Sequence, residues 1–187
     1  MRFTRAGRGR PGDRYRVVSM QALGLVWGNV DPLTADLEEV CTELPAPTLF
    51  GTRLLLEQWR AGEAAGGFVV GRDVPSRALA CVLRNLALYE PIDAKTDFRV
   101  RVAGTAVMRR FGRDITGRKL SEIYTPRNFE LERANMLAVI AQSKPDCVDV
   151  KLARDSRVFL HFEALQLPVW APNRISAWVL GGIFCFD

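Results

Sequence analysis

The sequence has few of the residues that metal centres and many catalytic sites require. It contains one histidine, His161, and four cysteines, none of them in a C-x-x-C pair. Zinc sites need several Cys or His ligands at short spacing, so we predict no metal site. A Ser-His or Cys-His catalytic pair would have to use His161. Scattered cysteines in a chain of 187 residues are typical of reduced cytosolic proteins.

Long apolar segments are also absent. No apolar run approaches the roughly 18 residues needed to cross a bilayer. An apolar stretch at residues 20–28 follows an arginine-rich start, but it is short and no A-x-A cleavage site follows it. We therefore predict a soluble, cytoplasmic protein.

The positive charge is concentrated at the start of the chain. Residues 1–19 hold six arginines and Asp13, which accounts for the whole net charge of +5, so residues 20–187 are neutral overall. A nucleic-acid-binding domain should carry its excess charge on the fold, which argues against that function for the folded part. We predict that residues 1–19 are a disordered tail or result from a misassigned start, with Met20 as the alternative start. Binding of nucleic acid or an anionic membrane by the arginine-rich tail is the alternative function.

Helical patterns flank a strand-rich region. Residues 20–47 form an extension in which a short helix is predicted over residues 36–42. A stronger helix is predicted over residues 49–65, where Leu55, Leu56 and Trp59 share one side. We expect this helix to pack on the sheet or to mediate dimerisation. A further short helix is predicted over residues 76–84.

Alternation of apolar and polar residues predicts the strands. Phe98, Val100 and Val102 alternate with arginines, the pattern of a half-buried strand. The last strand is apolar on both sides, so both of its faces should be covered. We therefore predict an α+β fold with a five-stranded antiparallel sheet, helices on one face and an N-terminal helical extension. The predicted strands span residues 86–90, 98–102, 148–152, 158–169 and 175–186.

The segment 97–120 is the most informative part of the chain. After the strand, a short helix is predicted over residues 106–111, then a turn with Gly112 and Gly117, then a second helix from Leu120. Glycine accepts positive φ, and Asp114 can accept hydrogen bonds from its own turn. Thr125-Pro126 then begins the longest helix, over residues 126–142. Its apolar stripe is predicted to be Phe129, Met136, Leu137 and Ile140, with Glu130, Glu132 and Arg133 on the polar side.

These motifs resemble those of PAS domains, and more narrowly those of short stand-alone PAS proteins that are common in alphaproteobacteria. The matching motifs are Gln58-Trp59-Arg60, Arg72-Asp73-Val74-Pro75, Asn85-Leu86-Ala87-Leu88, the stretch 98–105 and the stretch 111–117. The resemblance covers roughly residues 50–187. It is most specific at residues 97–120, and it implies a PAS-like domain over residues 48–187.

The resemblance implies a sensory module without catalytic activity. Such a module would bind a small hydrophobic or aromatic ligand, a partner signalling protein, or both, and it could form a homodimer; the cavity could also be filled by its own side chains. The expected pocket residues are Phe98, Val100, Phe129, Met136, Leu137, Leu160 and Phe162. The expected turn motif comprises Gly104, Phe111, Gly112, Asp114 and Gly117. The expected interaction helix presents Leu55, Leu56 and Trp59.

No cofactor is assigned by the sequence. His161 is expected to share a strand face with Glu163 and to pair with it, although a haem ligand is an alternative. Haem-binding PAS proteins usually place that histidine on the long helix, and residues 126–142 contain none. The Asn-Cys-Arg-Phe-Leu motif of flavin photoreceptors is also absent. An enzymatic function would depend on His161.

Overall fold

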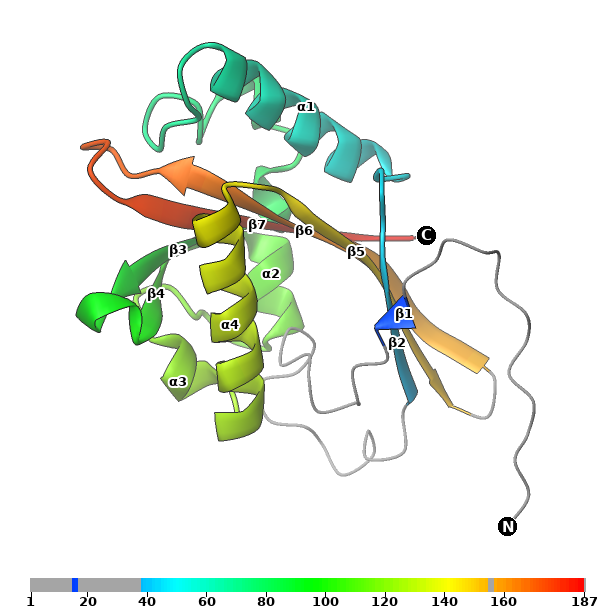
Figure 1. Cartoon of the computed structure of the whole chain (residues 1–187). Helices are drawn as coiled ribbons and strands as arrows, with labels where there is room; N and C mark the ends of the chain where they lie inside the picture. Colours follow the sequence, from blue (N-terminus) through cyan, green and yellow to red (C-terminus); the bar gives the residue numbers. More distant parts are fainter. Residues whose placement is uncertain (1–14, 17–37, 155–156, 187) are drawn as a thin grey trace.

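The computed structural model describes residues 15–16, 38–154 and 157–186 (Figure 1). Most of the predicted arginine-rich tail and part of the predicted helix 36–42 lie outside these residues. The strands are β1 (Tyr15–Arg16), β2 (Glu38–Glu43), β3 (Leu86–Ile92), β4 (Asp97–Ala103), β5 (Asp146–Arg154), β6 (Arg157–Trp170) and β7 (Ala177–Cys185). The α-helices are α1 (Phe50–Ala64), α2 (Thr105–Arg110), α3 (Leu120–Ile123) and α4 (Pro126–Gln142). Three 3₁₀ turns complete the order: η2 (Arg77–Leu79), η3 (Leu83–Asn85) and η4 (Asp93–Lys95).

All strand pairs are antiparallel, and the strand order is β1-β2-β5-β6-β7-β3-β4. The five predicted strands form the continuous part from β5 to β4. The predicted helix over residues 36–42 is wrong, because residues 38–43 form strand β2 on the free edge of β5. Pairing with that edge satisfies the backbone donors of β2, and this tertiary context outweighs local propensity. The predicted helix 76–84 is replaced by the turns η2 and η3.

The helices lie on both faces of the sheet (Figure 1). Helix α1 covers one face and contacts β6 and β7, while α2, α3 and α4 lie on the other face. Strand β7 is buried over most of its length, as expected for a strand covered on both sides. Of the two expectations for the helix over residues 49–65, packing on the sheet is confirmed; its part in dimerisation stays a prediction.

Helix α1 is fixed to the sheet by apolar burial and by one specific hydrogen bond. Leu55, Leu56 and Trp59 are buried in a core cluster with Trp178 and Phe184. Each buried side chain of this size stabilises a fold by roughly 1.5–3 kcal/mol. The indole Nε1 of Trp59 donates to the main-chain oxygen of Pro168 over 2.7 Å. These three side chains therefore face the sheet of their own chain.

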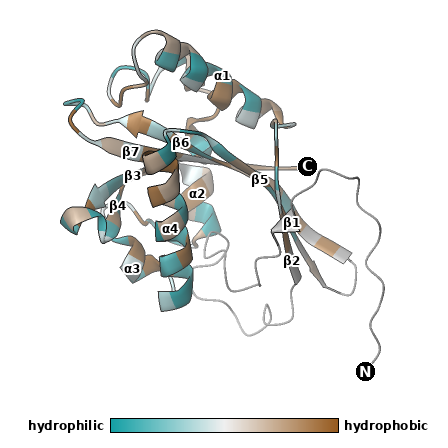
Figure 2. Cartoon of the chain, viewed as in Figure 1, coloured by the Kyte–Doolittle hydropathy of each residue, from teal (hydrophilic) through white to brown (hydrophobic). Residues whose placement is uncertain are grey.

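Helix α4 begins and ends as its sequence predicts, but its buried side differs from the prediction. Thr125 caps the helix by accepting from the backbone N–H of Asn128 over 3.4 Å, and Ser143 ends it in the left-handed conformation. Figure 2 shows hydrophobic and hydrophilic residues mixed along the helix. Met136 is buried as predicted, whereas Glu132 is only 2% exposed instead of lying on the polar side. The core beneath α4 thus contains a carboxyl group.

The glycine-rich turn after α2 forms backbone hydrogen bonds with the outer edge of β4. The backbone N–H of Val100 donates to Arg118 over 2.9 Å, and that of Gly117 donates to Val100 over 2.7 Å. Gly112 and Gly117 have φ of 64° and 83°, values that L side chains rarely adopt. The Oδ1 of Asp114 accepts from the N–H of Thr116 over 2.8 Å. The predicted positive φ of the two glycines and the predicted hydrogen bond of Asp114 within its own turn are confirmed.

Candidate ligand site between helix α4 and the sheet

A small cavity lies between α4 and the centre of the sheet. Its volume is about 20 Å³, which is enough for one water molecule. Strands β3, β6 and β7, helix α2 and helix α4 all contribute to its wall. The lining residues are Ala87, Tyr89, Val107, Glu132, Ala164, Leu165, Gln166, Gly181, Gly182 and Ile183.

One carboxyl–amide pair provides the polar part of the wall. The Oε1 of Glu132 on α4 accepts from the Nε2 of Gln166 on β6 over 2.7 Å. Burial raises the pKa of Glu132 to about 7; the hydrogen bond from Gln166 opposes this rise, and the charge of Asp146 adds to it. Glu132 therefore changes its protonation state near neutral pH. It also forms a direct hydrogen bond between α4 and the sheet.

Two acceptors on this side of the sheet have no hydrogen-bond partner among the residues that the structure describes. The Oε1 of Gln166 and the Oδ1 of Asn128, one turn before Glu132 on α4, are buried and unpaired within the described chain. A buried acceptor without a partner costs roughly 1–3 kcal/mol. Hydrogen-bond donors brought in by a water or a ligand would offset this cost.

The room for the cavity comes from a missing side chain on β7. A Cβ placed on Gly181 would meet Cε2 of Tyr89 at 3.1 Å, so a larger residue would crowd that ring. Burial and the nearby charge of Glu132 raise the pKa of Tyr89. Its hydroxyl therefore stays protonated.

A second buried carboxyl group lies on the opposite face of β6. Glu163 is fully buried and accepts from the N–H and Oγ1 of Thr48 over 2.7 and 2.5 Å. Its Oε2 accepts from the N–H of Leu49, the N-cap of α1, over 3.1 Å. Burial acts to raise the pKa of Glu163, but these hydrogen bonds outweigh it and lower the pKa. The carboxylate thus fixes the start of α1 to the sheet.

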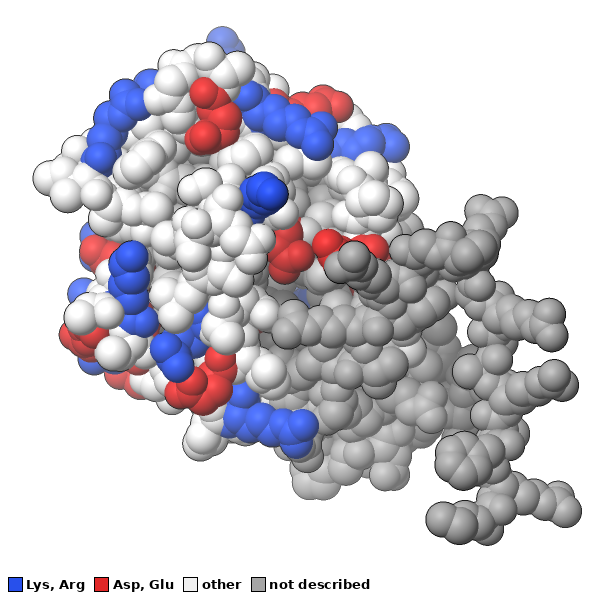
Figure 3. Space-filling view, in the orientation of Figure 1, with Lys and Arg blue, Asp and Glu red and all other residues white. Residues whose placement is uncertain are grey.

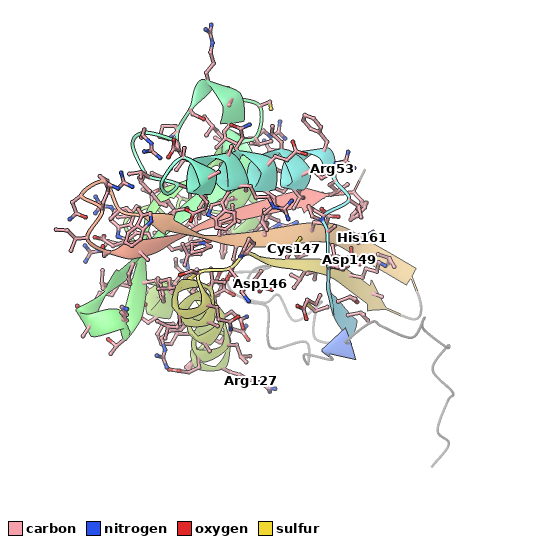
Figure 4. All side chains as sticks on the ribbon, turned by 45° about the horizontal axis from the view of Figure 1, so that its top comes forward. Arg53, Arg127, Asp146, Cys147, Asp149 and His161 are labelled. Carbon is pink, nitrogen blue, oxygen red and sulfur yellow. The ribbon has the colours of Figure 1, made fainter. Side chains whose placement is uncertain are left out.

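The single histidine has a partner other than the one predicted. The Nε2 of His161 lies 2.5 Å from Oδ1 of Asp149, and its ring stacks on Phe186 at 3.7 Å between centroids. Asp149 also pairs with Lys151 at 3.3 Å. The predicted His161–Glu163 pair is wrong, because the carboxylate of Glu163 instead accepts hydrogen bonds from the residues at the start of α1. Figure 4 shows His161 and Asp149 side by side, with Cys147 on the same strand as Asp149. Arg127 lies at the start of α4.

The described residues contain no group of three or more His, Cys, Asp or Glu side chains that could hold a metal ion. Among the same residues, no helix is both long and apolar enough to span a membrane. On the face drawn in Figure 3, cationic and anionic side chains are interspersed.

A comparison with protein-family models matches residues 51–184 to the PAS domain. The chain belongs to the PAS domain family. Comparisons with curated proteins and with solved structures gave no match. The antiparallel sheet and its helices fit the α+β PAS fold, and the membership indicates a sensory or signalling module in general terms.

The pocket residues expected for a PAS domain lie on two sides of the cavity, and none of them lines it. Phe98, Val100 and Met136 are buried in the core cluster beneath α4 that includes Tyr89, and Phe129 and Leu137 pack against this cluster. Phe162 is buried in a separate cluster with Ala164 and Ile183, against which Leu160 packs. The cavity lies where the two clusters meet, since each cluster contributes residues to its wall.

The polar residues of this PAS cavity were missed by the sequence analysis. Glu132 lies three residues after Phe129 and four before Met136, so it falls on the apolar stripe of α4. A glycine pair inside a strand, Gly181-Gly182, can mark a place where another group approaches closely. These two signals together could have located the cavity.

Proposed function

We propose that this PAS domain is a non-catalytic sensory module that binds a small ligand beneath α4 and transmits its state by protein–protein contact. The observation that carries the proposal is the incompletely hydrogen-bonded Glu132–Gln166 pair in the wall of the cavity. Ligand sites are commonly apolar cavities with a few convergent polar groups. The arrangement beneath α4 has this character.

The ligand would be small, largely apolar and equipped with a hydrogen-bond donor. The donor would meet Oε1 of Gln166 or the carboxyl group of Glu132. Anything larger than water requires α4 to move away from the sheet, because the cavity holds only about 20 Å³. The apolar part of the ligand would then lie between the two flanking clusters. In this proposal the cluster side chains Phe98, Val100, Phe129, Met136, Leu137, Leu160 and Phe162 become the apolar walls.

Strand β6 provides a route from the cavity to the opposite face of the sheet. Gln166 contacts α4 on one side, while Glu163 and Pro168 of the same strand hold α1 on the other. A ligand that displaces Gln166 would alter the position of β6 and thereby the attachment of α1. Population shifts of this kind need only a difference in ligand affinity between the two arrangements.

The proposed contact surface is the outer side of α1. Leu55, Leu56 and Trp59 are buried against their own sheet, so they could reach a partner or a second copy only if α1 were released. Phe50 and Arg53 are exposed in the attached state. A partner protein that binds only the exposed side of α1, or only the side that release uncovers, would respond to whether α1 is attached to the sheet.

The ligand can be sought by native and denaturing mass spectrometry of freshly purified protein, with an absorption spectrum of the same sample. We expect a mass excess in the native wild-type protein that is lost on denaturation. It should also be lost in Gln166→Leu and retained in Glu130→Gln, which changes an exposed residue of α4. A mass excess that persists in Gln166→Leu would exclude this cavity as the site, and a wild-type protein without any excess would contradict the ligand-binding half of the proposal.

A further inference from the structure

A second, larger hollow opens where α2, η3 and the end of β7 meet. Its volume is about 350 Å³, within the usual range for small-molecule sites. It shares no lining residue with the cavity beneath α4. We call it the arginine hollow, and it is lined by Arg84, Asn85, Ala106, Arg109, Arg110 and Cys185.

The arginine hollow is lined by three cationic side chains and, among the described residues, by no carboxylate. Arg84 comes from η3, and Arg109 and Arg110 come from the last turn of α2. None of the three forms an ion pair with a carboxylate of the described residues. The helix dipole favours cations at the end of α2, but it explains neither the presence of Arg84 nor the depth of Arg110. The excess positive charge indicates that the hollow suits an anion.

Arg110 is held in place at the wall of the hollow by two contacts. Its guanidinium lies over the ring of Phe162 at 4.3 Å, and its Nη2 donates to the Sγ of Cys185 over 3.2 Å. Its Nη1 is buried and has no hydrogen-bond partner within the described part of the chain. The guanidinium of Arg110 lines the hollow, and the planar donors of an arginine match carboxylate and phosphate oxygens.

We propose that the arginine hollow binds the phosphate group of a small phosphorylated molecule. Three guanidinium groups match the charge of a phosphate better than that of a single carboxylate. The amide of Asn85 is fixed nearby, because its Nδ2 donates to the main-chain oxygen of Ile183 over 2.8 Å. This site does not depend on the ligand proposed beneath α4.

The site can be tested by isothermal titration of the full chain with pyrophosphate at low salt, with citrate as the carboxylate comparison. We expect one pyrophosphate per chain and weaker binding of citrate. Arg84→Ala and Arg109→Ala should each weaken pyrophosphate binding about tenfold or more, since each removes a charge-assisted contact. Both residues are exposed, so both variants should fold. Arg53→Ala, which removes the same charge from α1 on the other side of the sheet (Figure 4), should bind like the wild type.

Three results would overturn the proposal. The first is the absence of saturable binding to the wild type. The second is equal binding by the wild type, Arg84→Ala and Arg109→Ala, which would place the anion elsewhere, for example on the arginine-rich residues 1–19. The third is binding of citrate at least as tight as that of pyrophosphate, which would reject the phosphate assignment.

Discussion

Strand β6 carries the buried carboxyl group of Glu163 on one face and, on the opposite face, contacts the buried carboxyl group of Glu132 from α4. The surroundings shift the pKa values of these two groups in opposite directions. Glu163 accepts hydrogen bonds from Thr48 and Leu49 at the start of α1, and these lower its pKa. Glu132 accepts from Gln166, and burial raises its pKa to about 7. The first carboxyl group is stabilised as an anion, whereas the second is not.

This difference separates a structural role from a proposed sensory one. A buried charge that is fully hydrogen-bonded fixes an element in place. A buried acid close to half-protonation, beside acceptors without partners, can respond to a ligand or to pH. We therefore expect α1 to be held more rigidly on the sheet than α4, and the side of the sheet beneath α4 to respond more readily to a ligand or to pH.

The largest effect is expected from Glu163→Ala. This change removes the buried carboxylate that accepts hydrogen bonds from Thr48 and Leu49 at the start of α1, so the free energy of unfolding should fall by about 3 kcal/mol. Urea unfolding followed by circular dichroism measures it. Glu57→Ala, on the exposed side of α1, is the control and should change stability by less than about 0.5 kcal/mol. A loss below about 1 kcal/mol in Glu163→Ala would contradict the structural role.

Glu132→Gln should instead stabilise the protein at alkaline pH. Because the folded pKa of Glu132 lies above the ordinary value of 4.5, its favourable contribution is complete below pH 4.5 and is lost as the pH rises through about 7. At pH 8 the glutamine variant should gain up to about 3 kcal/mol over the wild type, with little difference at pH 4.5. Urea unfolding at both pH values measures this. If the free energy of unfolding of the variant at pH 8 did not exceed that of the wild type, burial would not disfavour the ionised form of Glu132.

Glu163 contributes with the opposite sign. Its folded pKa is lowered, so its stabilisation is present above its ordinary pKa and is lost as the pH falls through the folded pKa.

Trp59→Phe tests the second attachment of α1. It keeps the aromatic packing but leaves the main-chain oxygen of Pro168 without the indole donor, which should cost about 1.5 kcal/mol. The measurement is again urea unfolding, with sedimentation to follow the oligomeric state. Unchanged stability together with a shift in oligomeric state would mean that Trp59 acts at a subunit interface and not on its own sheet.

The smallest effect is expected from Asp114→Ala. Asp114 is exposed, like the carboxyl groups of ordinary turns, and accepts from Thr116 within its own turn. Its loss should cost about 0.5 kcal/mol and leave the pH dependence of stability near neutrality unchanged. Thermal unfolding at pH 6 and pH 8 would reveal a larger or pH-dependent effect, which would mean that the turn is coupled to Glu132.

Most of the fold could be predicted from local patterns. The alternation around Val100 gives β4, Thr125-Pro126 gives the start of α4, and the glycines at 112 and 117 give the turn between α2 and α3. Strand β2 could not be predicted in this way, because residues 38–43 form a strand only through pairing with the edge of β5.

The polar part of the candidate site was not predicted, because its position depends on tertiary packing. Glu132 was assigned to the polar side of α4 by its residue type, although its spacing from Met136 places it on the buried stripe. Gln166 faces α4 because of the register of β6 against its neighbours, which a single sequence does not fix. The pairing of His161 with Asp149 likewise follows from the neighbouring positions of β5 and β6.

The most direct test of the account is the pKa of Glu132 in the folded protein, measured by carbon NMR of the side-chain carboxyl groups and assigned with Glu132→Gln. The account predicts a pKa of about 7 for Glu132 and a pKa below the ordinary glutamate value for Glu163. A pKa near the ordinary value of 4.5 for Glu132 would show that the carboxyl group is solvated or fully paired, and the proposed sensory site beneath α4 would lose its basis.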